Sequence, residues 1–79
     1  MKIRVFVTLK PDLLDPQGEA INAALLNLGF SNVKSVRQGK IIDIELSELD
    51  FKVARTRVEE MCDKLLANSI IENYSVEKL

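Results

Sequence analysis

Residues 33–46 read VKSVRQGKIIDIEL and form two strand-like runs around Gln38-Gly39-Lys40. In the second run, residues 41–46, apolar and acidic side chains alternate, which is typical of a half-buried strand. The spacing predicts a β-hairpin in which Gly39 supplies a positive φ in the turn.

The segment before this hairpin predicts a strand followed by a helix. Apolar residues alternate with other residues from Lys2 to Lys10, and Pro11 ends the strand. Asp15 is placed to cap a helix whose first residue is Pro16. Helical spacing then continues to Leu28, and Gly29 stands where a left-handed C-cap is expected.

The segment after the hairpin predicts a second helix and a last strand. An apolar stripe with helical spacing runs from Phe51 to Leu66. Ser47 and Asp50 have the spacing of a capping box, with Asp in place of the usual Glu. Asn68 is a plausible C-cap, and a strand is expected over about residues 70–76.

The order β-α-β-β-α-β predicts an α+β, ferredoxin-like fold with an antiparallel four-stranded sheet. Two helices are expected on one face, in a single domain over residues 1–79. On the other face the pattern places Phe6 and Ile41, and the last strand has apolar residues of both parities. Scattered exposed apolar residues would explain this. We favour a face closed by another chain, so that the protein dimerises through its sheet.

The residue inventory argues against catalysis by this chain alone. It has no His, and Cys62 is its one cysteine. The commonest general base, paired nucleophiles, a disulfide and a thiolate–imidazole zinc site are therefore excluded within one chain. Cys62 falls on the apolar stripe and is expected to be a buried structural thiol. A domain this small often gains stability by oligomerisation.

Charge and motifs exclude further classes. Eleven basic residues stand against 12 acidic ones, without the basic excess of a nucleic-acid binder. The three glycines fit no phosphate-binding loop. Neither a signal peptide nor a membrane-spanning run is visible, so a cytoplasmic location is expected.

Two loops carry candidate partner-binding residues, because loops placed by a scaffold commonly bind. The candidates are Asp15, Pro16, Gln17, Gly18, Arg37, Gly39 and Lys40. Gly18 in the first helical turn indicates either close approach by another group or simple tolerance at a frayed end. The two cations beside Gly39 mark either a contact surface or a solvated turn.

The sequence also resembles a known family over nearly its whole length. The matching stretches are VFVTLK (5–10), LDPQG (14–18), LGF (28–30), VRQGK (36–40), MCDKLLAN (61–68) and IIENY (70–74). These are similar to PurS, the small S subunit of phosphoribosylformylglycinamidine synthase. Ser69, where the family often has Pro, and residues 47–57 depart from the pattern.

The resemblance implies a non-catalytic subunit of an ATP- and glutamine-dependent ligase in de novo purine biosynthesis. It implies a homodimer, sometimes a tetramer, that bridges a glutaminase subunit and a large synthetase subunit and assists ammonia transfer. It implies no cofactor on this chain, while the whole complex uses ATP, Mg and glutamine. The alternative is a ferredoxin-like regulatory module that binds a small molecule; RNA binding is disfavoured.

Overall fold

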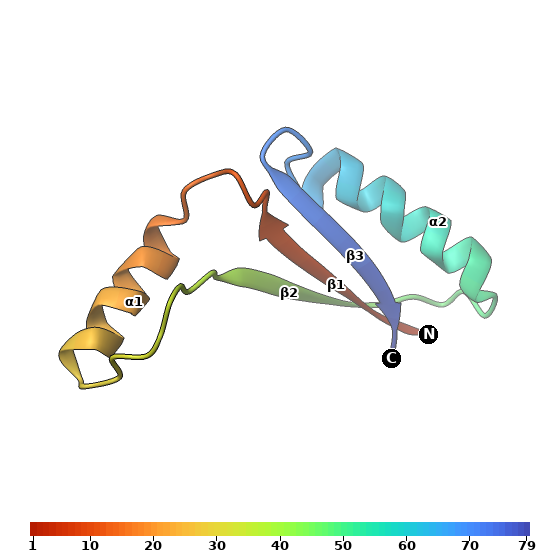
Figure 1. The fold of residues 1–79 in the computed structure, drawn as a ribbon. Coiled ribbons are helices and arrows are strands. Elements are labelled where there is room, and N and C mark those ends of the chain that lie inside the picture. The colour runs from red at the N-terminus through yellow and green to blue at the C-terminus, as the bar shows by residue number, and fades with distance from the viewer.

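The computed structural model describes all residues, Met1–Leu79, and the order of elements is β-α-β-α-β (Figure 1). The strands are β1 (Lys2–Leu9), β2 (Gly39–Glu45) and β3 (Glu72–Lys78). The helices are α1 (Pro16–Asn27) and α2 (Phe51–Met61), and α2 continues as one π-helical segment, η1 (Cys62–Leu66). None of the helices is long and apolar enough to cross a membrane.

The sheet is antiparallel and has three strands in the order β2-β1-β3, so the prediction of four strands is wrong. Val5 of β1 lies opposite Ile42 on one side and Val76 on the other. The expected hairpin is missing because Gly39 is not a turn residue. It pairs with Thr8 as the first residue of β2, and Gly29 is the one glycine with a positive φ.

Gly39 is needed for a different reason than the one predicted. A Cβ atom on Gly39 would lie 2.6 Å from the carbonyl oxygen of Val7 and 2.8 Å from the Thr8 side chain. The glycine therefore allows β1 to approach the start of β2 closely. Residues 33–38 run on from that start, away from the sheet (Figure 1).

The core lies between β1 and α2. The fully buried large side chains are Ile3, Val5 and Val7 from β1 with Val58 and Cys62. Burial raises the pKa of the Cys62 thiol, with Asp63 and Glu59 adding to the effect. The prediction that Cys62 is buried on the apolar stripe is confirmed. Asp50 is the N-cap of α2 and accepts from the Lys52 N–H, instead of standing inside the first turn.

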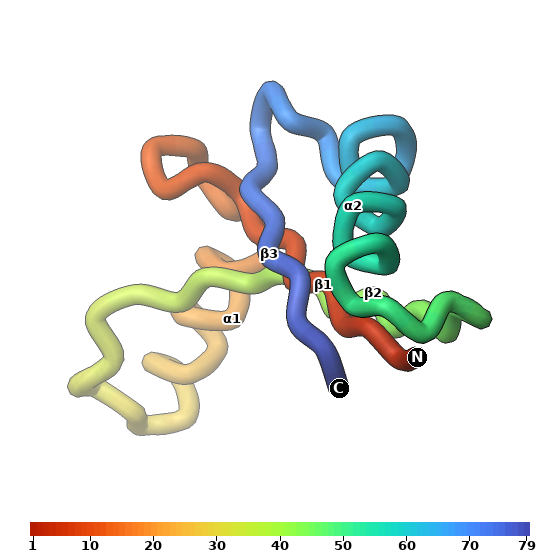
Figure 2. The backbone as a smooth tube through the Cα atoms, turned by 90° about the vertical axis from the view of Figure 1, so that its right-hand side faces the viewer, coloured from red at the N-terminus to blue at the C-terminus, as the bar shows by residue number.

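α1 does not cover the sheet, so the prediction of two helices on one face is also wrong. We call residues 11–38 the arm; it projects from the end of the sheet where β1 ends and β2 begins (Figures 1 and 2). No residue from 19 to 38 is buried. The Cα radius of gyration is 15.9 Å, against about 12 Å expected for a compact chain of this length.

The predicted helix itself is confirmed. Asp15 caps it, Pro16 is its first residue, and Gly29 follows the C-cap Leu28 with a φ of 100°. Propensity and capping determine this helix locally, while the side on which it packs depends on the hinge at residues 38–39.

The face of the sheet away from α2 is more polar than expected. Arg4 Nε and Asp43 Oδ1 form an ion pair of 2.8 Å across β1 and β2 on this face. Ile41 is 56% exposed there, and Phe6 is half-buried. Ile70 and Ile71 precede β3 and lie in the turn before it, so they do not contribute to this face.

Candidate partner-binding site

Asp15 holds the base of the arm together. Its Oδ1 accepts a hydrogen bond of 3.0 Å from the Gly18 N–H, and its Oδ2 accepts one of 2.6 Å from the Gln38 N–H. The first bond caps α1, and the second ties that cap to the residue just before β2. Asp15 is 5% exposed, and these two bonds, chiefly the one from Gln38, lower its pKa.

Arg37 adds a second tie. Its guanidinium donates to the carbonyl oxygens of Leu13 at 2.7 Å and Lys10 at 3.0 Å. The side chain expected to face a partner thus satisfies the backbone of its own loop. Its loss would loosen the arm as well as remove a surface charge.

At Gly18 the start of α1 lies very close to the backbone of Val36. A Cβ atom there would lie 2.3 Å from the carbonyl oxygen of Val36 and 2.8 Å from Asp15 Oδ2. Of the two explanations for Gly18, the structure supports close approach by another backbone, and that backbone belongs to the same chain. We use the name clasp for the contacts of Asp15, Gly18, Arg37 and Gln38.

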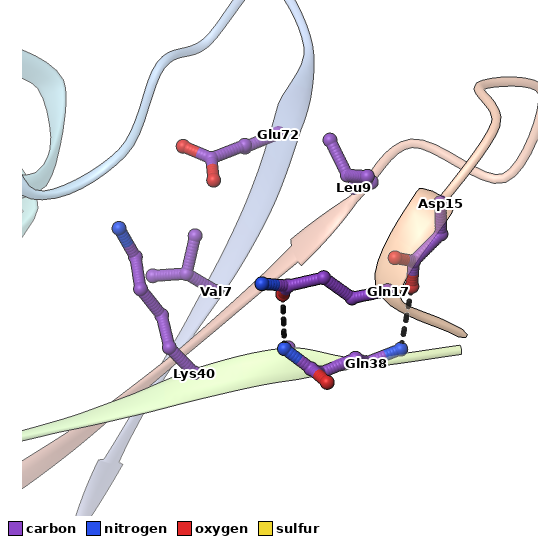
Figure 3. Close-up of a pocket in the computed structure, with 8 residues that line it drawn as sticks. Val7, Leu9, Asp15, Gln17, Gln38, Lys40 and Glu72 are labelled. Atoms are coloured by element: carbon purple, nitrogen blue, oxygen red, sulfur yellow. Dashed lines mark hydrogen bonds between the residues drawn. The ribbon is translucent and has the colours of Figure 1, made fainter. Parts of the chain in front are cut away.

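Beside the clasp is an open pocket of about 250 Å³ at the junction of the arm and the sheet (Figure 3). Its floor is Val7 and Leu9. Its polar lining is Asp15, Gln17, Gln38, Lys40 and Glu72, with Gly39 completing it. Lys40 and Glu72 extend into the same space from β2 and β3, and the Gln38 amide donates to the Gln17 side chain (Figure 3).

Four of the seven predicted residues line this pocket: Asp15, Gln17, Gly39 and Lys40. Gly18 does not line it, but its N–H donates to Asp15. Pro16 opens α1 beside them, and Arg37 lies on the clasp. Gln38 and Glu72 were not among the predicted residues. Gln38 lies next to Arg37 and Gly39 in the chain, so its position gave a local signal, whereas Glu72 comes from β3 and only the fold brings it here.

The pocket is lined mainly by polar and charged side chains. It holds one cation, Lys40, two carboxylates, Asp15 and Glu72, and the amides of Gln17 and Gln38 over an apolar floor. Glu72 also accepts from the Asn68 N–H at 2.7 Å. These charged and amide side chains can form hydrogen bonds and ion pairs with a polar segment.

The clasp should respond to acid. The folded pKa of Asp15 is lower than its unfolded value of 3.8, so its ionised form stabilises the fold above about pH 4 and that contribution is lost as the pH falls through the folded pKa. We expect the amide NMR signals of Gly18 and Gln38 to be constant from pH 7 to 5 and to shift together below about pH 4.

Asp43 supplies the matched control. Its pKa is also lowered, by the hydrogen bond from Arg4, but it lies on the sheet. Asp43→Asn should leave the acid shift of the Gly18 and Gln38 amides in place, and Asp15→Asn should abolish it. The same acid shift in an Asp15→Asn chain would contradict the role of the Asp15 carboxylate.

The chain is similar to known proteins over nearly its whole length. Residues 2–79 match the family model PurS, described as phosphoribosylformylglycinamidine (FGAM) synthase. The PurS subunit of Bacillus subtilis is 46% identical over 78 residues, which is 96% of this chain and 89% of that protein. The PurS subunit of Synechocystis is 46% identical over 74 residues, 94% of this chain and 74% of that protein.

Solved structures share the shape of the chain. The crystal structure of Methanocaldococcus jannaschii PurS has a TM-score of 0.86 at 46% identity, covering 99% of this chain and 96% of that one. A chain in the PurLQS structure from Thermotoga maritima has a TM-score of 0.90 at 32% identity, covering 99% and 95%. Both comparisons cover 99% of this chain, so the matched region includes the arm.

Proposed function

Since this chain belongs to the PurS family, whose members are subunits of phosphoribosylformylglycinamidine synthase in purine biosynthesis, we propose that it is the non-catalytic assembly subunit of that enzyme. It bridges the glutaminase and synthetase subunits and assists the transfer of ammonia between them. The observation that carries the proposal is the close match, arm included, to a chain in the solved PurLQS assembly.

The structure of this chain supports a bridging role. An adaptor needs two separated surfaces held at a fixed angle, and here the body and the arm are joined by the clasp. The molecule extends over 48 Å while only 14 Å thick. A rigid, elongated adaptor raises the effective concentration of ammonia at the acceptor by fixing the two active sites relative to each other.

The proposal extends to partners, cofactors and location. The chain acts as a homodimer that can pair further into a tetramer, and its other partners are the two larger subunits. It holds no cofactor itself; ATP, Mg and glutamine are used by the rest of the complex. The enzyme works in the cytoplasm.

Reconstitution with the glutaminase and synthetase subunits tests the bridging role. With glutamine as nitrogen donor, omitting the chain should abolish most FGAM formation. With a high concentration of ammonium chloride, the synthetase should still work, because free ammonia bypasses the bridge. Equal glutamine-dependent rates with and without the chain would contradict bridging. A specific thermal shift with an amino acid or nucleotide, and no association with the subunits, would favour the regulatory alternative.

Single substitutions test the site. Gln17→Ala and Lys40→Ala remove side chains of the pocket, and we expect each to weaken complex formation about five- to tenfold, as for interface residues that cost over 1 kcal/mol. The measurement is the dissociation constant for the larger subunits by titration. The matched control is Arg57→Ala on the outer surface of α2, which should change the dissociation constant less than about twofold. Equal effects of all three substitutions would contradict the assignment.

A further inference from the structure

The carboxylates that line the pocket beside the clasp already have donors within the chain. The two Asp15 oxygens each accept a hydrogen bond from a backbone N–H. The pKa of Asp15 is lowered chiefly by the bond from Gln38, and the positive charge of Arg37 adds to the effect. One oxygen of Glu72 accepts a hydrogen bond of 2.7 Å from the Asn68 N–H. The negative groups of the pocket are therefore largely satisfied by this chain.

The donors of the pocket are not satisfied in the same way. The exposed Lys40 side chain extends into the pocket (Figure 3), and it belongs to none of the three ion pairs of the chain. The oxygen of the Gln17 amide accepts from the Gln38 amide, which leaves the NH₂ group of Gln17 free to donate elsewhere. An ammonium group and an amide NH₂ group thus extend into the same space, where an anionic acceptor could bind both.

The lining of the pocket selects among anions. A phosphate group carries about two negative charges and binds best at a helix N-terminus or against a guanidinium. Here the Asp15 side chain already caps the N-terminus of α1, and Arg37 donates to two carbonyl oxygens of its own loop. A carboxylate on a short aliphatic stem fits better. It carries one charge for Lys40, and its methylene groups can lie on the apolar floor of Val7 and Leu9.

The size and place of the pocket favour a side chain of another protein over a free small molecule. Small-molecule sites commonly have about 300–1,000 Å³ and bury most of the ligand, whereas this pocket is open and has about 250 Å³. Its lining comes from the arm through Asp15 and Gln17, and from β2 and β3 through Lys40 and Glu72. A side chain inserted here contacts the arm and the sheet together, so a partner can recognise the angle between them.

We propose that this pocket receives the carboxylate of one aspartate or glutamate side chain of a larger subunit, which pairs with the Lys40 ammonium and accepts from the Gln17 amide. The inference rests on the proposed function and names the chemistry by which the site recognises its partner. Charge complementarity of this kind contributes specificity. Glu72, which extends into the same space, repels a second carboxylate and so limits the pocket to one acidic side chain.

A zero-length cross-link tests the contact directly. A water-soluble carbodiimide activates a carboxylate, and an amine in contact with it then forms an amide, while the carbodiimide takes up the water and leaves as a urea. In the complex reconstituted with both larger subunits, we expect Lys40 to be joined to an aspartate or glutamate of one of them, as identified by mass spectrometry after digestion. A cross-link from Lys40 only to Glu72 of its own chain or to a second copy would overturn the proposal, and so would the absence of any Lys40 cross-link.

Lys40→Arg is the matched control for the cross-link. The guanidinium keeps the positive charge but is not acylated by the activated carboxylate. The complex should therefore still form, with a dissociation constant within about threefold of the unaltered chain. The cross-link at position 40 should be absent.

The signs of three substitutions provide a second test, measured as dissociation constants for the larger subunits. Lys40→Glu should weaken binding at least about thirtyfold, because it brings two carboxylates together. Glu72→Gln keeps an acceptor for the Asn68 N–H and removes a negative charge, so binding should be unchanged or up to about threefold tighter. Lys52→Met, which removes an exposed cation of α2, should change binding less than about twofold. Weaker binding of Glu72→Gln would indicate a cationic occupant and overturn the proposal.

Failure of this inference can be told apart from failure of the proposed function. In the isolated chain, light scattering should show that Lys40→Glu leaves self-association unchanged; a weakened dimer would make a second copy the occupant and overturn the proposal. If the unaltered chain supports glutamine-dependent FGAM formation and the Lys40 substitutions change nothing, the inference alone fails. If the unaltered chain does not bind the larger subunits, the proposed function fails and the inference fails with it.

Discussion

Gly18→Ala is expected to disrupt the clasp and with it the assembly of the enzyme. The new Cβ atom would lie 2.3 Å from a backbone oxygen of Val36, which cannot rotate away as a flexible side chain could. Displacing residues 36–38 also pulls the Gln38 N–H from Asp15. Overpacking of this kind costs about 1–3 kcal/mol, which corresponds to a roughly 5- to 150-fold weaker complex with the larger subunits if the arm must be rigid to bind. The measurement is the dissociation constant for the larger subunits by titration.

Gly29→Asn is the matched control for that substitution. Gly29 also lies in the arm, but a Cβ atom there meets nothing within 4 Å. Its φ of 100° favours glycine, and asparagine is the residue that best tolerates such a position at the end of a helix. We expect a smaller loss than with Gly18→Ala. If Gly29→Asn proves as damaging, general sensitivity of the arm would explain the result, and the clasp would not.

Ile3→Ala is expected to have the largest effect on the stability of the body. Ile3 is fully buried, in a core of only seven buried apolar residues. Removing a buried isoleucine side chain costs about 2–5 kcal/mol, which is a large share of the free energy of unfolding of a small domain. The expected fall in melting temperature is at least about 10 °C. Thermal denaturation followed by circular dichroism, at one fixed chain concentration, measures it.

Ile41→Ala provides the same chemical change in the neighbouring strand. Ile41 points to the opposite face and is 56% exposed, so its truncation should change the free energy of unfolding by less than about 0.5 kcal/mol. Similar losses for Ile3→Ala and Ile41→Ala would mean that the face away from α2 is covered in solution. That outcome would indicate that another chain contacts the Phe6–Ile41 face.

The candidate site was predicted in part. Capping chemistry predicted the positions of Asp15 and Pro16, because an N-cap acts through residues that are close in sequence. The second bond of Asp15, to the Gln38 N–H, joins residues 23 apart. The entry of Glu72 into the pocket depends on the pairing of β3 with β1. Neither of these long-range contacts has a local signal in the sequence.

Residues 33–46 also combine features that the sequence predicts with one that only the tertiary structure decides. Alternation correctly predicted β2. The helix caps and the strand periodicity could also be predicted from the sequence, because each depends on residues that lie close together along the chain. Family membership could be predicted from sequence similarity to the family. The direction of the chain at Gly39 was decided by tertiary structure. A glycine suits a tight turn and a close strand contact equally well, and the approach of Val7 and Thr8 made it a strand residue. That single choice converts an expected four-stranded fold into a three-stranded body with a projecting arm.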